Sequence, residues 1–363
     1  MNDKLSKYMI RYFRQRILTL SLFTVHCSLF IAHSQVGGSS TYSFLDLTPS
    51  GHVAALGGKV NAVLGDDPSL AFYNPGLLDS TANNSMSLSF INLFAGINFG
   101  YVAYSRSYNN IGNFAAGIHY INYGKFTEAD NSGLILGNYT AAEYAFNLTY
   151  SRFLPWLDSA FSVGVNVKPV LSVFERYSSY GLLGDFGVSY RHPDKLFTAA
   201  LVLRNMGGQI TPYSDGGREP VPFEVQLGAT QKLQYAPFRF SVTVQHLNRL
   251  QLGYNKANTN PAPGQKPVKE EDLKKGFDLI IDETLRHLIV GVECFPFQGL
   301  TIRAGYNYNR RQEMKTDTKP AMVGFSWGLG INLARFNIDY ARSSWHLAGA
   351  SNHISLRIKT VRP

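Results

Sequence analysis

The chain has 363 residues, with 34 Lys and Arg against 25 Asp and Glu, which gives a formal net charge of +9 at pH 7. The basic residues are scattered and form no stripe interleaved with aromatic residues, which argues against nucleic-acid binding. The composition of 24 Phe, 21 Tyr and 33 Gly, with few charged helix-forming stretches, favours an all-β protein.

Residues 1–34 are predicted to be a cleavable signal peptide. Positive side chains up to Arg16 precede an apolar run over residues 17–32, and Ala32-His33-Ser34 offers the small residues that cleavage needs. Without this segment, 29 Lys and Arg face 24 Asp and Glu, and the net charge falls to +5. Lipid attachment at Cys27 is a weak alternative because that cysteine lies within the apolar run. A retained transmembrane anchor is another, although the run is short for a bilayer span.

Residues 35–84 are predicted to form a small hatch in the periplasmic mouth of a barrel. The stretch from His52 to Val63 is small and semi-apolar, which suits a compact helix or turn packed inside another structure. Asp66-Asp67-Pro68 opens a further short helix and Asn74-Pro75 ends it. A leading segment that rests outside the barrel is the alternative. The hatch residues singled out are Leu56, Gly57, Gly58, Asp66, Asp67, Asn74 and Pro75.

Residues 85–363 are predicted to form the barrel itself. Apolar and small or polar residues alternate repeatedly, as in Met86-Ser87-Leu88-Ser89-Phe90 and in residues 143–150. This period of two is typical of strands with one face toward lipid and the other toward a lumen. Counting such segments predicts an all-β, transmembrane antiparallel β-barrel of about 14 strands. A soluble β-sandwich is the alternative, because its strands also alternate.

The connections between the predicted strands follow a rhythm of short and long. The short ones, predicted to be periplasmic, are residues 108–110, 154–158, 192–195, 235–237, 297–299 and 332–333. The long ones, predicted to face outward, are residues 130–141, 207–221, 248–283, 310–320 and 344–350, with a tight first connection at residues 93–96. Outer-membrane barrels have this arrangement, whereas a sandwich has no reason to produce it.

The sequence offers little for catalysis. No HExxH, CxxC or GxSxG pattern or phosphate-binding loop is present, so no enzyme, cofactor or metal is expected. His119 and His353 are predicted to be polar lumen residues rather than members of a hydrolase triad. Asp66 and Asp67 are too few to complete a calcium shell. Further charges are predicted to pair inside the lumen: Asp185, Glu224, Glu293, Arg303, Arg335 and Asp339.

Several motifs of the chain resemble a known family. They are Phe44-Leu45-Asp46-Leu47, Ala54-Ala55-Leu56-Gly57-Gly58, Asp66-Asp67, Asn74-Pro75-Gly76-Leu77-Leu78, Leu203-Arg204-Asn205-Met206-Gly207-Gly208 and Pro222-Phe223-Glu224-Val225-Gln226-Leu227-Gly228. The resemblance that they carry covers most of the chain after the signal peptide. They resemble the PorV/PorQ group of outer-membrane proteins of the type IX secretion system, which are related in fold to fatty-acid transporter barrels.

The resemblance implies a multi-pass outer-membrane barrel of fourteen strands without enzymatic activity. It implies membership of the attachment complex with PorU and PorV, in which the barrel holds a PorZ-like surface protein while cargo is joined to lipopolysaccharide. The outer-loop residues predicted to contact this partner are Tyr213, Arg218, Tyr254, Lys266, Lys269, Lys274 and Lys275. The alternative function is transport of hydrophobic small molecules across the outer membrane.

Overall fold

The computed structural model describes residues 40–93, 96–130, 132–155, 160–214, 217–253, 275–314, 322–346 and 349–360. The predicted signal peptide and the first residues of the predicted hatch lie outside this part of the chain. None of the helices in the described ranges is long and apolar enough to cross a membrane.

Short helices precede the first strand. They are η1 (Ser43–Asp46), α2 (Gly51–Ala55), η2 (Pro68–Phe72), η3 (Pro75–Leu77) and η4 (Ser80–Ala82). The Asp67 carboxylate accepts a hydrogen bond from the Ser69 amide, and the Asn74 side chain accepts one from the Gly76 amide, each over 2.8 Å. A capping side chain followed by proline explains why η2 and η3 begin where they do.

Fourteen strands follow in one closed antiparallel barrel. They are β1 (Ser85–Asn92), β2 (Asn98–Tyr108), β3 (Gly112–Ala129), β4 (Ile135–Phe153), β5 (Phe161–Phe174), β6 (Tyr177–Arg191), β7 (Phe197–Thr211), β8 (Glu224–Lys232), β9 (Phe238–Val244), β10 (Leu288–Phe297), β11 (Leu300–Asn307), β12 (Phe325–Asn332), β13 (Phe336–His346) and β14 (Gly349–Lys359). Each strand pairs with its chain neighbours, and β1 pairs with β14 from Ser85↔Lys359 to Asn92↔Asn352, which closes the sheet. The predicted fold class is confirmed.

The strands alternate between a buried lumen face and an apolar outer face. In β1, Ser85, Ser87 and Ser89 are buried while Phe90 is exposed. The exposed outer face of the wall carries Val102, Phe114, Ile118, Phe146, Leu148, Val165, Val167, Leu182, Leu201, Leu227, Phe240, Val242, Val290, Ile302, Trp327 and Leu329. An apolar exterior around a polar-lined interior is the pattern of membrane barrels.

The short connections lie where the sequence predicts them, but two predicted outer loops are wrong. Strands β3 and β4 pair as far as Ala129↔Ile135, so most of residues 130–141 is strand. Strands β13 and β14 likewise pair to His346↔Gly349, which leaves almost no loop in residues 344–350. Residues 130–136, Asp-Asn-Ser-Gly-Leu-Ile-Leu, do not alternate, so the sequence pattern marks a loop where the two strands continue.

Two further helices lie in the outer connections that were predicted as loops. Helix α3 (Gly276–His287) directly precedes β10. Helix α4 (Tyr308–Met314) directly follows β11, in the connection to β12. Residues 254–274, which include predicted contacts Tyr254, Lys266, Lys269 and Lys274, lie outside the described residues.

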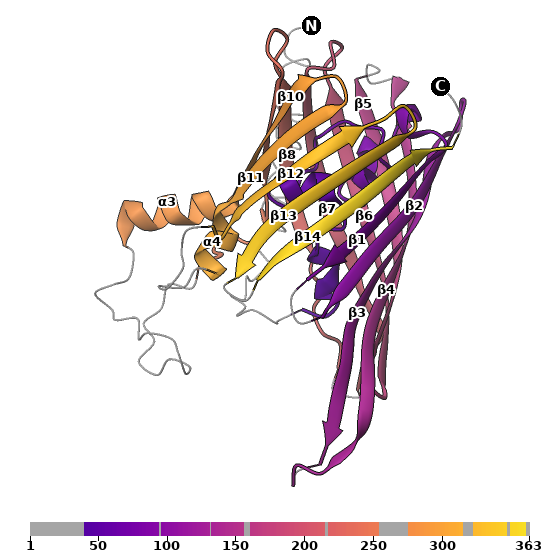
Figure 1. Cartoon of the computed structure of the whole chain (residues 1–363), viewed down its shortest axis with the longest axis vertical. Helices are drawn as coiled ribbons and strands as arrows, with labels where there is room; N and C mark the ends of the chain where they lie inside the picture. The colour runs from indigo at the N-terminus through magenta and orange to yellow at the C-terminus, as the bar shows by residue number, and fades with distance from the viewer. Residues whose placement is uncertain are drawn as a thin grey trace, which may run out of the picture. The chain divides into compact units, whose positions relative to one another are not determined.

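The N-terminal segment lies inside the barrel (Figure 1). At the end with the long connections, the Thr41 amide donates to the Pro220 carbonyl over 2.9 Å. At the opposite end, Asp79 pairs with Arg191, the last residue of β6. The segment therefore runs through the lumen instead of resting in the periplasmic mouth alone. The half of the lumen toward the long connections is called the outer half. Burial of apolar residues such as Phe44 and Leu45 in this half explains why the segment extends beyond the predicted hatch position.

Candidate functional site

Glycines of the barrel wall allow the N-terminal segment to approach the wall backbone closely, because they have no side chain. A Cβ on Gly305 of β11 would lie 2.2 Å from the Gly57 nitrogen, and one on Gly164 of β5 would lie 2.3 Å from the Pro75 carbonyl carbon. Real Cβ atoms do not approach this closely, so only glycine fits at both wall positions. Three hatch residues predicted from sequence, Leu56, Gly57 and Pro75, thus lie against wall backbone.

Gly57 and Gly58 end α2 with a change of chain direction. Their φ angles of 100° and 97° lie in the region that disfavours residues with a side chain. The Gly58 carbonyl accepts a hydrogen bond from the Thr48 hydroxyl over 2.7 Å. The turn brings Lys59 to β8 of the wall, where it joins a buried group of polar side chains.

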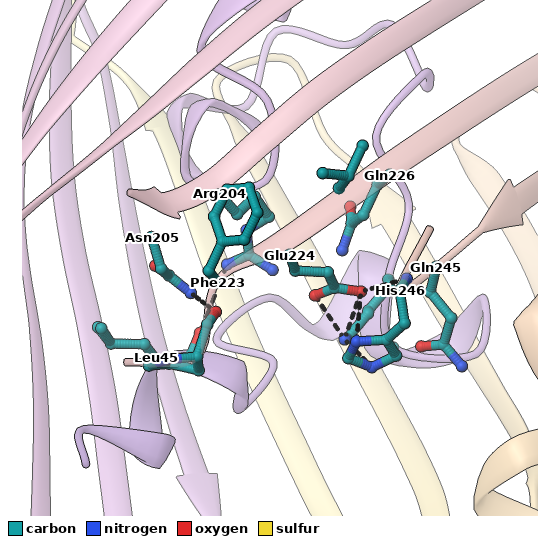
Figure 2. Close-up of polar contacts among 12 residues, drawn as sticks. Leu45, Arg204, Asn205, Phe223, Glu224, Gln226, Gln245 and His246 are labelled. Carbon is teal, nitrogen blue, oxygen red and sulfur yellow. Dashed lines mark hydrogen bonds and ion pairs between the residues drawn. The ribbon is translucent and has the colours of Figure 1, made fainter. Parts of the chain in front are cut away.

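Lys59 forms an ion pair with Glu224 of β8. Its Nζ lies 2.8 Å from Oε2 and 3.0 Å from Oε1 of a carboxylate that is almost fully buried. His246, just after β9, completes the group: its Nε2 lies 3.4 Å from Lys59 Nζ. Figure 2 shows the Glu224 carboxylate and the His246 ring pointing toward one another. Burial, with the nearby Lys59 charge as the second cause, lowers the pKa of His246 to about 4.

A bulge in the wall brings a second polar group into the lumen. The pairing of β6 with β7 shifts between Gly184↔Met206 and Phe186↔Leu203, so Arg204 and Asn205 are both buried although they are consecutive. Asn205 has a φ of 55°, and its amide donates to the Asp185 carboxylate over 2.9 Å. Lys168 Nζ lies 2.8 Å from the other Asp185 oxygen. The bulge thereby positions the Asp185 carboxylate, which neutralises the charge of the buried Lys168.

Arg204 reaches from this bulge to the N-terminal segment (Figure 2). Its Nη2 donates to the Leu45 carbonyl over 3.4 Å, and its guanidinium lies 5.2 Å from the centre of the Phe72 ring. Such a contact supplies cation–π attraction where water is excluded. The wall and the segment are held together here by a charge that the sequence analysis did not single out.

A third group connects α2 with four strands. His52 Nε2 lies 3.0 Å from Glu293 Oε1, and Glu293 also pairs with Arg239 and, over 3.0 Å, with Arg303. Arg303 continues to Asp339 over 2.5 Å. The predicted pairing of lumen charges therefore occurs for Asp185, Glu224, Glu293, Arg303 and Asp339.

Arg335 departs from that prediction because it is exposed in the turn between β12 and β13. It lines a cavity of about 270 Å³ together with Asp66, Arg357 and Lys359. Asp66 pairs with Arg357 and, over 2.8 Å, with Lys359, which attaches the N-terminal segment to β14. Alternation alone could not place Arg335, since a turn residue has no fixed side of the sheet.

The two candidate histidines are buried side chains of the lumen. His119 is surrounded by aromatic rings, with centroid distances of 5.3 Å to Phe44 and Phe72. His353 Nε2 lies 2.8 Å from the Ser351 hydroxyl. Within the described ranges, no three His, Cys, Asp or Glu residues gather as a metal site. Both histidines therefore contribute to the packing and polarity of the lumen.

The outer half of the lumen holds an apolar cluster. Tyr42, Phe44 and Leu45 of the N-terminal segment pack with wall residues. The wall contributes Ile91, Phe99, Ile121, Ala145, Val170 and Leu183. The Tyr42 hydroxyl lies 2.6 Å from the Ser179 hydroxyl at its edge. The segment thus fills the lumen with apolar side chains where it is not ion-paired.

The described partner-contact candidates are dispersed over the outer end. Arg218 and Lys275 are exposed, in agreement with a surface location. Tyr213 instead packs on the wall, where its hydroxyl donates to the Ser172 hydroxyl over 2.5 Å. Burial raises its pKa to about 12. Tyr213 and Arg218 belong to the connection between β7 and β8, whereas Lys275 precedes α3.

The most prominent outer feature is a ribbon that the sequence analysis read as a loop. Pairing of β2 with β3 stops at Asn98↔Asn122, and pairing of β4 with β5 stops at Ala141↔Phe174. Residues 125–129 and 135–140 therefore pair only with each other. In Figure 1 this β3–β4 ribbon extends well past the other strands. Leu134, Ile135 and Leu136 at its tip are 64%, 67% and 60% exposed.

Comparisons with known proteins give distant similarities. No protein-family model matches the sequence, and no curated protein matches it. The solved toluene transporter TbuX of Ralstonia pickettii is 11% identical over 88% of this chain and 98% of that one, with a TM-score of 0.48. The toluene transporter TodX of Pseudomonas putida is 12% identical over 86% and 97%, with a TM-score of 0.49.

A FadL homologue of Pseudomonas aeruginosa is 12% identical, over 86% of this chain and 97% of that one, with a TM-score of 0.47. This chain is similar to these barrels in its strand architecture. The similarity assigns no activity to it.

Proposed function

We propose that the protein is a non-enzymatic outer-membrane barrel that anchors a surface partner through its outer end. The observation that carries this proposal is the β3–β4 ribbon, with its unpaired edges and its exposed apolar tip. The motif resemblance supports the type IX attachment complex as its setting, in the place of PorQ. The partner would then be a PorZ-like surface protein, beside PorU and PorV and close to lipopolysaccharide.

The ribbon has the chemistry of a protein-binding element. An unpaired strand edge presents a row of free amides and carbonyls that an extended segment of another chain can join as an additional strand. The exposed side chains of Leu134, Ile135 and Leu136 would gain from burial in a pocket of that partner. Phe126 and Tyr139 stack across the ribbon with ring centres 5.3 Å apart, which stiffens it.

The interior of the barrel supports a static role. Moving the N-terminal segment would separate Lys59 from Glu224 and Asp79 from Arg191. Breaking a buried ion pair so that one charge remains unpaired costs about 3–5 kcal/mol. A lumen closed by these two pairs suits an anchor better than an open conduit.

The test is recovery of the partner from intact outer membranes. Replacing Leu134, Ile135 and Leu136 by Ser keeps the strands and removes the apolar tip. We expect a stoichiometric surface protein to co-purify with the unchanged chain and to be lost with this variant. Arg176→Ser is the matched control, because this residue is exposed in the tight β5–β6 turn at the same end. Equal recovery of the surface protein with both variants would show that the ribbon tip does not bind it.

The second candidate is transport of a small hydrophobic molecule. The apolar cluster around Phe44 in the outer half of the lumen favours it, because such a ligand could replace these side chains. Transport would require the N-terminal segment to move. Two of the solved barrels described above, TbuX and TodX, are named as toluene transporters.

A disulfide between the segment and the wall separates the two candidates. A Cβ on Gly51 would lie 3.3 Å from the Ser355 hydroxyl oxygen of β14, so Gly51→Cys with Ser355→Cys can form a crosslink. Cys294→Ser and Cys27→Ser remove the two cysteines of the natural sequence. An anchor keeps its partner after oxidation and shows no toluene uptake in either state. Uptake that is present when reduced and lost when oxidised would instead establish the transporter.

A further inference from the structure

Helix α3 has its polar and apolar faces arranged opposite to those of an ordinary surface helix. Phe277, Ile280, Ile281 and Leu285 are all exposed, with Phe277 at 74% and Ile280 at 62%. These positions follow the i, i+3, i+4, i+8 spacing of one helical stripe. An amphipathic helix of a soluble domain would turn such a stripe toward its own core.

The polar face of α3 is the face that binds the rest of the protein. Asp282 is buried, pairs with Arg286 over 2.8 Å and accepts a hydrogen bond from the Tyr308 hydroxyl over 2.8 Å. The Glu283 carboxylate accepts hydrogen bonds from the Leu252 and Gly253 amides, at 2.8 Å and 3.0 Å. These contacts fix the rotation of the helix and leave the apolar stripe facing away from the barrel.

The placement of α3 connects its stripe with the apolar exterior of the wall. The helix leads directly into β10, whose Val290 is exposed on the outer face beside Val242 of β9. In Figure 1 the orange helix leaves the wall sideways at the strand ends, across the direction of β10 and β11. Twelve residues span about 18 Å. A helix in this position runs beside the barrel, in the direction of the membrane plane.

We propose that α3 is a membrane-interface helix whose apolar stripe, formed by Phe277, Ile280, Ile281 and Leu285, inserts into the outer leaflet beside the barrel. Interfacial helices bind lipid by burying one apolar face at the boundary between headgroups and acyl chains. The stripe continues the apolar surface that the wall already presents to lipid. The preceding residues 254–274 are mostly polar and charged, so they offer little apolar surface to cover it.

The experiment measures whether lipid or water surrounds the apolar stripe in the full-length chain. Nitroxide labels are attached in a Cys27→Ser, Cys294→Ser background at Ile281→Cys and, as the matched control on the same helix, at the exposed Asp278→Cys. The barrel is inserted in vesicles of phosphatidylethanolamine and phosphatidylglycerol. We expect the ratio of oxygen to nickel-chelate accessibility to be several-fold higher at position 281 than at position 278.

Three outcomes would overturn the proposal. Equal accessibility at both positions would place the stripe in water. If the nickel-chelate accessibility at position 281 falls as the protein-to-lipid ratio rises, the stripe contacts a second copy of the chain. Protection that disappears when residues 254–274 are deleted would assign it to that segment. A second variant, Ile280→Glu, should lower the ratio at position 281 while the barrel remains folded on gels without heating.

Discussion

The N-terminal segment in the lumen and the projections at the outer end use apolar residues in opposite ways. Leu45 in the lumen is fully buried, whereas Leu136 at the ribbon tip is 60% exposed. The segment meets wall glycines at van der Waals limits, while the ribbon beyond residue 125 pairs with neither β2 nor β5. Buried and exposed apolar surface therefore belong to different parts of the molecule: the lumen holds the barrel together, and the proposed binding surface lies on the exposed ribbon.

This contrast limits where a function can be altered without loss of the fold. A substitution in the lumen changes contacts that both the segment and the wall depend on, so its effect on activity is confounded by stability. A substitution on the ribbon or the α3 stripe changes only surface that is already exposed. The predictions below test whether the two regions are as independent as the structure indicates.

The largest effect is expected at the closest approach of the segment to the wall. In Gly305→Val, the Cβ would lie 2.2 Å from the Gly57 nitrogen, and Gly305 cannot retreat without breaking the pairing of β11 with β10. We expect this variant to lose the folded, heat-modifiable form on gels. Gly208→Ala of β7 is the control, because its Cβ meets nothing within 4 Å. A normally folded Gly305→Val would show that the segment can leave the lumen.

Glu224→Gln should cause the next largest loss. The substitution keeps the shape of the side chain but leaves Lys59 in a buried site without its counter-charge. We expect the free energy of unfolding in denaturant to fall by about 3–5 kcal/mol. Combining Glu224→Gln with Lys59→Gln should recover part of this loss, since no unpaired charge remains. If the double variant were no better than the single one, the ion pair would not be the cause.

The fold could be predicted from the sequence because alternation is a local property. Ser85, Ser87 and Ser89 already mark the lumen face, and the turn residues mark most strand ends. The free ribbon could not be predicted, because residues 134–140, Leu-Ile-Leu-Gly-Asn-Tyr-Thr, lack the alternation that marks the strands of the wall. Whether a segment continues the wall depends on the lengths of β2 and β5, which are distant in sequence.

The candidate site was predictable only in part for a related reason. The carboxylates Asp185 and Glu224 could be recognised as lumen charges from their strand positions, but their partners could not. Lys168 comes from a neighbouring strand and Lys59 from the N-terminal segment. The bulge at Arg204 and Asn205 violates the alternation on which the prediction depends. The exposed stripe of α3 is not predicted either, because residues 248–283 are expected only as a long outer connection.

Acidification should weaken the Lys59–Glu224–His246 group by a smaller amount. The pKa of His246 in the fold, about 4, lies below the usual value of 6.5 because of burial and the neighbouring Lys59. A lowered histidine pKa means that the unfolded chain binds the proton first. The contribution of His246 is therefore fully present above pH 6.5 and is lost as the pH falls toward about 4.

The measurement is the free energy of unfolding between pH 7 and pH 4.5. His246→Gln should remove this part of the pH dependence and leave the rest of the curve unchanged. His192→Gln is the control, because that histidine is exposed in the β6–β7 turn. An identical slope for both variants would indicate that the pKa of His246 is the same in the folded and the unfolded chain.

The smallest effect on stability is expected at the ribbon tip, and it makes the comparison quantitative. Leu136→Ala removes the same atoms as Leu45→Ala but from an exposed position instead of a fully buried one. The buried truncation should lower the free energy of unfolding by about 2–5 kcal/mol. The exposed one should change it by less than about 0.5 kcal/mol. A large loss from Leu136→Ala would mean that the ribbon tip already packs on something in the membrane, which would make it part of the fold instead of a surface held for a partner.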